Sequence, residues 1–365
     1  MTFRSVFTSS CSLVVALAAL GAVHCAHKVN VGFDLEPVAD EAGVAPAPPA
    51  TTMVFAANEA GAPDGGVPGV GFQFLVTETP PNSNPQTLWL GIARYDVASD
   101  GAPATPAAEI NKTSVADPAG LAFRKESAEL FVGNRHGNMA ADGIPGSITR
   151  FLYDAKTKTF TANGQITGNQ LNGVHQVTFN PVNGECFAAN AASGISRFTF
   201  DKTGNAIPNG VLGTDSMRGL AVSADGHRLY ATTAGDIIEQ FDLTTGTRLP
   251  DVVVASNAAL HFMAIFGSDL YVPGIFANRV FRFAIGPADE LTLKDSIPGD
   301  EPISVAFSPD GLEMFVAGHL ASSTIGRFSY DKTTDKWNST TTINGPSSMG
   351  TLLVFASDAV PTHVN

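Results

Sequence analysis

The sequence predicts an all-β fold, a β-propeller of six four-stranded blades, with seven blades as the alternative. Two short strings repeat along the chain at a nearly constant spacing, and the composition is typical of many short strands joined by tight turns. Only 15% of the 365 residues are charged, and there are 36 Gly, 23 Pro and 24 Phe residues. A repeat period in the forties suits one propeller blade of four strands.

The first repeated string is an aliphatic residue, a variable residue, usually Arg, and an aromatic residue. It occurs as IARY, ITRF, ISRF, IEQF, VFRF and IGRF, with the aromatic residue at positions 95, 151, 198, 241, 283 and 328. Six occurrences at intervals of 42 to 56 residues indicate a repeated unit. We expect the string to form the third strand of each blade.

The second string precedes a tight turn. It occurs as DPAGLAF, GVHQVTF, SMRGLAV, ALHFMAI and EPISVAF, and the following turns include NPVNG, SADG and SPDG. Asn, Asp and Gly favour such turns through side-chain caps and positive φ. A short apolar strand such as ELFVG or ECFAA follows, and a polar strand such as KTFTANGQI ends the unit. Each unit is therefore one antiparallel sheet, and a radial array leaves only short, protected sheet edges.

The two ends of the array predict how the propeller closes. The segment PSSMGTLLVFAS, at 346–357, begins like a first strand but has no third or fourth strand after it. We therefore expect N-terminal and C-terminal strands to pair within one blade. The segment TTMVFAA, at 51–57, could instead begin a seventh blade.

The N-terminus predicts export from the cytoplasm. Residues 1–25 hold an apolar run that is too short to span a bilayer and fits a signal peptide. The string LGAVHC resembles a bacterial lipobox with Cys25 as the lipid-bearing residue, although His24 replaces the usual small residue. A periplasmic or cell-surface lipoprotein and a soluble secreted protein are both open. Residues 26–50 predict a disordered Ala/Pro-rich tether, and residues 51–365 form the propeller domain.

Charge and cysteine content exclude other classes. The net charge of −13 and the lack of a basic run argue against nucleic-acid binding. Cys186 is the one cysteine beyond the signal segment, and it occupies a second-strand position that is Leu or Met in other repeats. We expect it to be a buried core residue and not a reactive thiol. The repeated Arg of the third strand, at 94, 150, 197, 282 and 327, predicts a packing role within or between blades.

The sequence from Pro302 to Ala317, with its AFSPDG turn, resembles the surface-layer, YVTN-type repeat. The array from about residue 51 to 365 is similar to the secreted lactonase-like propellers. That family includes lactone hydrolases such as 6-phosphogluconolactonase-like proteins and many secreted members without a known activity. The resemblance marks the blade and carries no catalytic residues over to this chain.

Register gives a candidate catalytic site. In a propeller the first strand of each blade starts at the face where the second strand ends. Four residues before the end of each second string stand Ala119, His175, Arg218, His261 and Ile303. His175 or His261 could activate water as a general base, and Arg218 could stabilise the oxyanion on an ester or lactone carbonyl.

The ends of the second strands give candidate binding residues at the same face. The residues that lie three to five positions after the aromatic residue of a second strand include five polar ones: Asn134, Arg135, His136, Asn190 and His319. These positions should surround the same channel mouth. Their aligned set lacks carboxylates, so we expect no cofactor and no dedicated metal site, with a divalent metal ion as a minor alternative.

Two functions remain open. The favoured one is an exported, non-enzymatic propeller that binds an envelope or extracellular protein or a glycan through its loop face. The alternative is a lactonase-like hydrolase of a small lactone or ester that uses the His and Arg residues at the mouth. Fold analogy alone does not decide between them.

Overall fold

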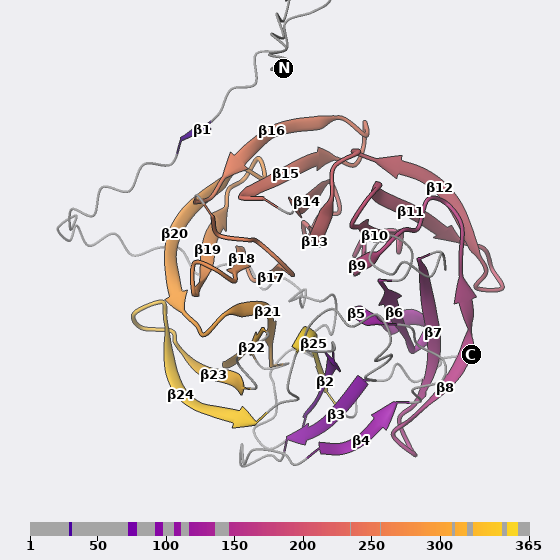
Figure 1. Ribbon diagram of the computed structural model, residues 1–365, viewed down its shortest axis with the longest axis horizontal. Coiled ribbons are helices and arrows are strands. Elements are labelled where there is room, and N and C mark those ends of the chain that lie inside the picture. The colour runs from indigo at the N-terminus through magenta and orange to yellow at the C-terminus, as the bar shows by residue number, and fades with distance from the viewer. Residues whose placement is uncertain are drawn as a thin grey trace, which may run out of the picture.

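The computed structural model is a β-propeller whose sheets surround a central axis (Figure 1). It describes residues 29–30, 72–78, 92–97, 106–110, 117–135, 146–233, 235–255, 257–308, 311–319, 324–344 and 349–356. The predicted signal peptide, the segment 51–57 and all of the tether except residues 29–30 lie outside the described residues. In the described part, no helix is long and apolar enough to cross a membrane.

The described residues form five four-stranded antiparallel blades. The first joins β25 (Met349–Ala356), β2 (Phe72–Glu78), β3 (Ile92–Val97) and β4 (Pro106–Ile110) in that order. The others run from the inside outward as β5 (Pro118–Arg124), β6 (Glu129–Asn134), β7 (Ser147–Asp154) and β8 (Thr159–Ile166); β9 (Val174–Phe179), β10 (Cys186–Asn190), β11 (Gly194–Phe200) and β12 (Ala206–Leu212); β17 (Ala264–Phe266), β18 (Asp269–Gly274), β19 (Arg279–Ile285) and β20 (Leu291–Pro298); and β21 (Pro302–Phe307), β22 (Glu313–Gly318), β23 (Thr324–Asp331) and β24 (Lys336–Asn344). A 3₁₀ turn, η1 (Lys125–Ser127), joins β5 to β6.

The remaining sheet has five strands, which corrects the predicted count. It contains β13 (Met217–Val222), β14 (Arg228–Thr233), β15 (Ile237–Asp242), β16 (Arg248–Val253) and β1 (Val29–Asn30). The expectation of six, or seven, four-stranded blades is therefore wrong: five blades are four-stranded. The outer edge of β16 has open backbone groups, and β1 pairs with it in parallel through Val29↔Val252 and Asn30↔Val253. The repeat pattern carried no sign of this strand, because it lies in the segment before the array.

Strands from the two ends of the array share one blade. The C-terminal strand β25 pairs antiparallel with β2, with Phe74 opposite Val354 and Leu75 opposite Leu353. Figure 1 shows β25 at the inside of this blade, next to the axis, and β4 at its outside. The C-terminal segment therefore supplies the inner strand that β2–β4 lack, as its sequence led us to expect.

The core lies between the inner strands of neighbouring blades. Every residue of β9 and β10 is buried, whereas β12 is mostly exposed. Inner strands are covered on both faces and read as continuous apolar runs, while an outer strand keeps one face in water. Cys186 is fully buried in the cluster that contains Phe131, Phe179 and Phe198, and burial raises the pKa of its thiol. The prediction of a core cysteine is confirmed.

Tight turns join the first and second strands, as the turn residues predicted. Gly184, Gly226 and Gly311 have φ values of +70°, +75° and +68°, the left-handed region that favours glycine. In the NPVNG turn, Oδ1 of Asn180 accepts a hydrogen bond from the Val182 amide at 2.9 Å, while its Nδ2 donates to the Gly226 carbonyl at 2.8 Å. Asn180 thus caps its own turn and links it to the next sheet.

The repeated arginines pack against the second strand of their own blade, and Arg282 also pairs with Asp335 in the β23–β24 turn of the next blade. Arg150 lies opposite Phe131 in the β6–β7 register, with its guanidinium 5.3 Å from the ring centroid and 2.7 Å from Glu129. The same arrangement, an arginine over the opposite ring and paired with an acid two residues before that ring, recurs for Arg197 with Phe187 and Glu185, Arg282 with Tyr271 and Asp269, and Arg327 with Phe315 and Glu313. The predicted packing role is confirmed for these four, and the Arg94 side chain lies outside the described residues.

Candidate functional site

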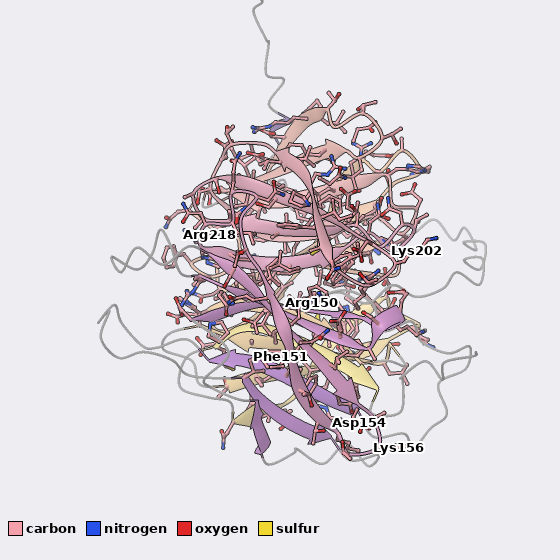
Figure 2. The ribbon with its side chains drawn as sticks, turned by 90° about the vertical axis from the view of Figure 1, so that its right-hand side faces the viewer. Arg150, Phe151, Asp154, Lys156, Lys202 and Arg218 are labelled. Atoms are coloured by element: carbon pink, nitrogen blue, oxygen red, sulfur yellow. The ribbon has the colours of Figure 1, made fainter. Side chains whose placement is uncertain are left out.

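The candidate site lies where the inner strands begin. Figure 1 places β5, β9, β13, β17 and β21 next to the axis. His175 and Arg218 are the second residues of β9 and β13, and His261 stands three residues before β17. Figure 2 shows the propeller from the side, with Arg218 at one face and Lys202, in the turn between β11 and β12, at the other. We call the Arg218 end of the channel the mouth.

The side chains of His175 and Arg218 are hydrogen-bonded to each other. The guanidinium Nη1 of Arg218 donates to Nε2 of His175, and Nδ1 of the same ring lies 2.9 Å from the Gly173 carbonyl. The Gly173 carbonyl can only accept a hydrogen bond, so Nδ1 carries the hydrogen, and the Arg218 guanidinium can only donate one, so Nε2 is the acceptor. The network therefore assigns the neutral tautomer with hydrogen on Nδ1. Burial lowers the pKa of His175 well below its usual value, and the charges of Arg218 and Arg135 lower it further. Because its Nε2 lone pair is occupied, His175 acts here as the hydrogen-bond acceptor that orients Arg218.

His261 has a different environment. Its Nδ1 lies 3.1 Å from the Ala259 carbonyl, which assigns the hydrogen to Nδ1 and leaves Nε2 as an acceptor. No hydrogen bond to Nε2 comes from the part of the chain that the structure describes. Burial lowers the pKa of His261 to about 3, and the charges of Arg218, His319 and Arg135 add to this effect. His261 is therefore a neutral histidine with a free lone pair.

The loop before His261 is held by an aspartate that sequence reasoning missed. The Asp236 carboxylate accepts hydrogen bonds from the amides of Asn257, Ala258 and Ala259 at 2.5, 2.6 and 3.3 Å. Asn257 and Ala259 have positive φ, which turns these successive N–H groups toward one anion. Asp236 directly precedes β15 in the neighbouring unit, so no repeat position pointed to it.

Arg135 and His319 extend the cluster. The Arg135 side chain pairs with Asp117 at 2.6 Å, and its backbone amide donates to the Asp117 carbonyl at 3.0 Å. The backbone of His319 donates to the Glu301 carbonyl at 2.8 Å, and its ring centroid lies 6.2 Å from that of His261. Burial lowers the pKa of His319, and Arg135 lowers it as well, while Glu301 acts in the opposite direction.

The two predicted asparagines turn inward. Asn134 donates to the hydroxyls of Ser147 and Thr149, each at 3.0 Å, and is fully buried. Asn190, equally buried, accepts from the Asn172 amide at 3.0 Å and donates to Ser196 at 3.0 Å. Their amides are used to join the second strand of a blade to its third, so we do not include them in the proposed ligand site. His136 lies outside the described residues.

The charge balance defines what the mouth can bind. Arg218 is partly buried, and within the described ranges no carboxylate forms an ion pair with it. Burial lowers its pKa, and the nearby charge of Arg135 lowers it further. In the same ranges, no group of three or more His, Cys, Asp or Glu side chains is arranged to hold a metal ion. A half-buried cation beside neutral histidines is suited to an anion or to an oxygen that gains negative charge during a reaction.

Comparisons with known proteins support the fold. No protein-family model and no curated protein sequence matches the chain. Among solved structures, the periplasmic gluconolactonase of Pseudomonas aeruginosa has a TM-score of 0.55 at 16% identity and covers 80% of this chain and 100% of its own. A candidate 6-phosphogluconolactonase of Bacteroides fragilis has a TM-score of 0.55 at 16% identity over 74% of this chain and 81% of its own. A nidogen/laminin complex has a TM-score of 0.55 at 15% identity over 78% and 99%.

At these identities the likeness shows the fold alone. The chain is a β-propeller similar in structure to gluconolactonase and 6-phosphogluconolactonase-like propellers. The resemblance to surface-layer repeats and to secreted family members stays a prediction.

Proposed function

We propose that the mouth is a lactonase-like site that binds a lactone with a negatively charged substituent and hydrolyses it to the hydroxy acid. The observation that carries the proposal is Arg218, a half-buried guanidinium without a carboxylate partner in the described residues, next to two neutral histidines. The gluconolactonase-like propellers with the same fold make lactones the first substrate class to test.

His261 is the proposed base. Its free Nε2 takes a proton from water, and the hydroxide attacks the lactone carbonyl carbon. An N–H of Arg218 stabilises the resulting oxyanion, as the donors of an oxyanion hole do. The ring C–O bond then breaks, and the leaving alkoxide takes the proton back from His261. One water is consumed, and the product is the open hydroxy acid.

The low pKa of His261 favours an anionic substrate. A pKa of about 3 makes the imidazole a weak base in the free protein, because burial and the charges of Arg218 and Arg135 disfavour its protonated form. A bound anion near these arginines offsets the part of this effect that comes from their charge, and so raises the pKa of His261. Substrates that carry an anion would thus activate the base better than neutral ones.

The experiment is a lactone panel with matched histidine variants. The purified protein is assayed on neutral, carboxylated and phosphorylated lactones with and without chelator, alongside His261→Ala and the control His227→Ala, which changes an exposed histidine in the turn before β14. Turnover that is lost in His261→Ala, retained in His227→Ala and unaffected by chelator supports the proposal. A folded protein that hydrolyses no member of the panel overturns it.

A binding role is the second candidate. Gln176, 1% exposed, is hydrogen-bonded to the Leu220 amide in β13 and to the Met263 carbonyl just before β17, so it ties neighbouring inner segments together beside the mouth. Phe276, 67% exposed, lies in the β18–β19 turn at the same end of its blade. We propose an envelope or extracellular protein or a glycan as the partner in that case, with export of the chain as a secreted, periplasmic or Cys25-anchored protein. Absence of turnover with retained binding of such a partner would favour this candidate.

A further inference from the structure

Gln176 joins the three chain segments that carry the mouth residues. Its Oε1 accepts a hydrogen bond from the Leu220 amide at 2.8 Å, and its Nε2 donates to the Met263 carbonyl at 3.3 Å. Gln176 directly follows His175, while Leu220 and Met263 stand two residues after Arg218 and His261. One buried amide therefore ties together the backbone segments of His175, Arg218 and His261.

Thr232, on β14, makes a second connection closer to the mouth. Its hydroxyl accepts from the Gly219 amide at 2.7 Å and donates to the His261 carbonyl at 2.9 Å, and the residue is fully buried. A Cβ on Gly219 would overlap the His261 carbonyl. The Arg218 and His261 segments are thus in close contact, with one hydroxyl fixing their relative position.

Propeller geometry explains why such bridges are needed. The inner edge of each inner strand faces the channel, so its N–H and C=O groups have no further strand to pair with. The Gln176 amide supplies one acceptor and one donor to such backbone groups, as another strand would. The Thr232 side chain does the same with a single hydroxyl, which accepts one hydrogen bond and donates another.

We propose that Gln176 and Thr232 are positioning residues that hold His175, Arg218 and His261 at their working separation. Neither side chain needs to touch the ligand. The kinetic consequences rest on the proposed function, whereas the environment of the His261 ring can be measured without any substrate.

The test uses isosteric variants and a matched control. Thr232→Val removes the hydroxyl and keeps the shape, Thr232→Ser retains the hydroxyl, and Gln176→Met removes the amide at similar length. Thr178→Val is the control, because Thr178 is fully buried in β9 and its hydroxyl bonds to no described residue. The full chain is labelled with ¹⁵N-histidine, and loss of a signal in His261→Ala assigns the His261 ring among the eight histidines.

We expect Thr232→Val and Gln176→Met to shift the ¹⁵N signals of His261 and to lower kcat by up to about 10²-fold, with a smaller change in KM. Thr232→Ser should restore both, and Thr178→Val should change neither. His261 signals and kcat equal to those of Thr178→Val in both folded variants would overturn the inference. If Thr232→Val does not fold, Gln176→Met and Thr232→Ser carry the comparison. Absence of lactone turnover in the unmodified protein would overturn the proposed function, and the His261 signals would still decide this inference.

Discussion

The Arg218 guanidinium donates to Nε2 of His175, a residue 43 positions earlier and at the same place in the preceding repeat. The bond uses the Nε2 lone pair of His175 and one N–H group of Arg218. Repeat register placed both histidines and the arginine at one face but could not distinguish the two histidines. The Arg218–His175 contact distinguishes them, because it leaves His261 as the histidine whose Nε2 lone pair has no hydrogen bond from the described residues.

The two histidines should therefore have different kinetic roles. His261→Ala removes the proposed base and should lower kcat on an anionic lactone by about 10²- to 10⁴-fold. His175→Ala removes an acceptor of Arg218 and should mainly raise KM, by about tenfold, the usual scale of a charge-assisted hydrogen bond. Steady-state kinetics of both variants measure this. A larger kcat loss in His175→Ala than in His261→Ala would contradict the assigned roles.

The histidines also predict how stability depends on pH. Their pKa values are lowered on folding, so between pH 6.5 and about 3 the unfolded chain takes up protons that folded His261 does not. Stability should therefore fall as the pH drops through this window, by up to about 1.4 kcal/mol per pH unit for one histidine. The difference in unfolding free energy between the unmodified protein and His261→Ala, measured by denaturant titration at several pH values, isolates the effect.

Glu239 predicts the opposite pH dependence. It is fully buried beside Arg248 at 3.0 Å, and burial, together with the nearby Asp215 carboxyl, raises the pKa of its carboxyl from 4.5 to about 8. The folded chain then keeps a proton that the unfolded chain loses, so this contribution is fully present below pH 4.5 and is lost as the pH rises to 8. Denaturant titration of Glu239→Gln should show no such loss. An unchanged pH slope in Glu239→Gln would contradict the raised pKa.

The within-blade arginines should support stability without affecting the site. Arg197 binds Glu185 at 2.7 and 3.0 Å, and Glu185 is 5% exposed. Arg197→Met leaves this carboxylate with the Asn209 amide as its remaining side-chain partner in the described residues, and should cost about 2–4 kcal/mol of unfolding free energy. The exposed control Arg279→Met should change it by less than about 0.5 kcal/mol. Equal unfolding midpoints for the two variants would contradict the assigned role.

Periodicity accounts for what the sequence predicted well. The inner strands β9, β13 and β21 are almost wholly buried, so the strings around Phe179, Val222 and Phe307 repeat visibly, and strand positions follow from them. The same register brought His175, Arg218 and His261 to one end of the channel. Cys186 was placed in the core because its repeat equivalents are apolar.

What the sequence did not predict is specific to single blades. Gln176, Thr232 and Asp236 act through hydrogen bonds to backbone groups outside their own strands. The residues at the repeat positions equivalent to Gln176 have no side-chain amide: Gly120, Gly219, Phe262 and Ser304. The strand β1 was missed because two residues pair through their backbone with an open sheet edge. No periodic signal reports such pairings.

The central claim is that Arg218 makes the mouth selective for negatively charged lactones, and a ratio of rates tests it most directly. The kcat/KM for a carboxylated lactone is divided by that for its neutral isostere, in the unmodified protein and in Arg218→Gln. The account predicts a ratio well above one that falls by about tenfold or more in Arg218→Gln, since a charge-assisted contact of about 1.4 kcal/mol corresponds to a factor of ten. A ratio near one in the unmodified protein, or one that Arg218→Gln leaves unchanged, would contradict it.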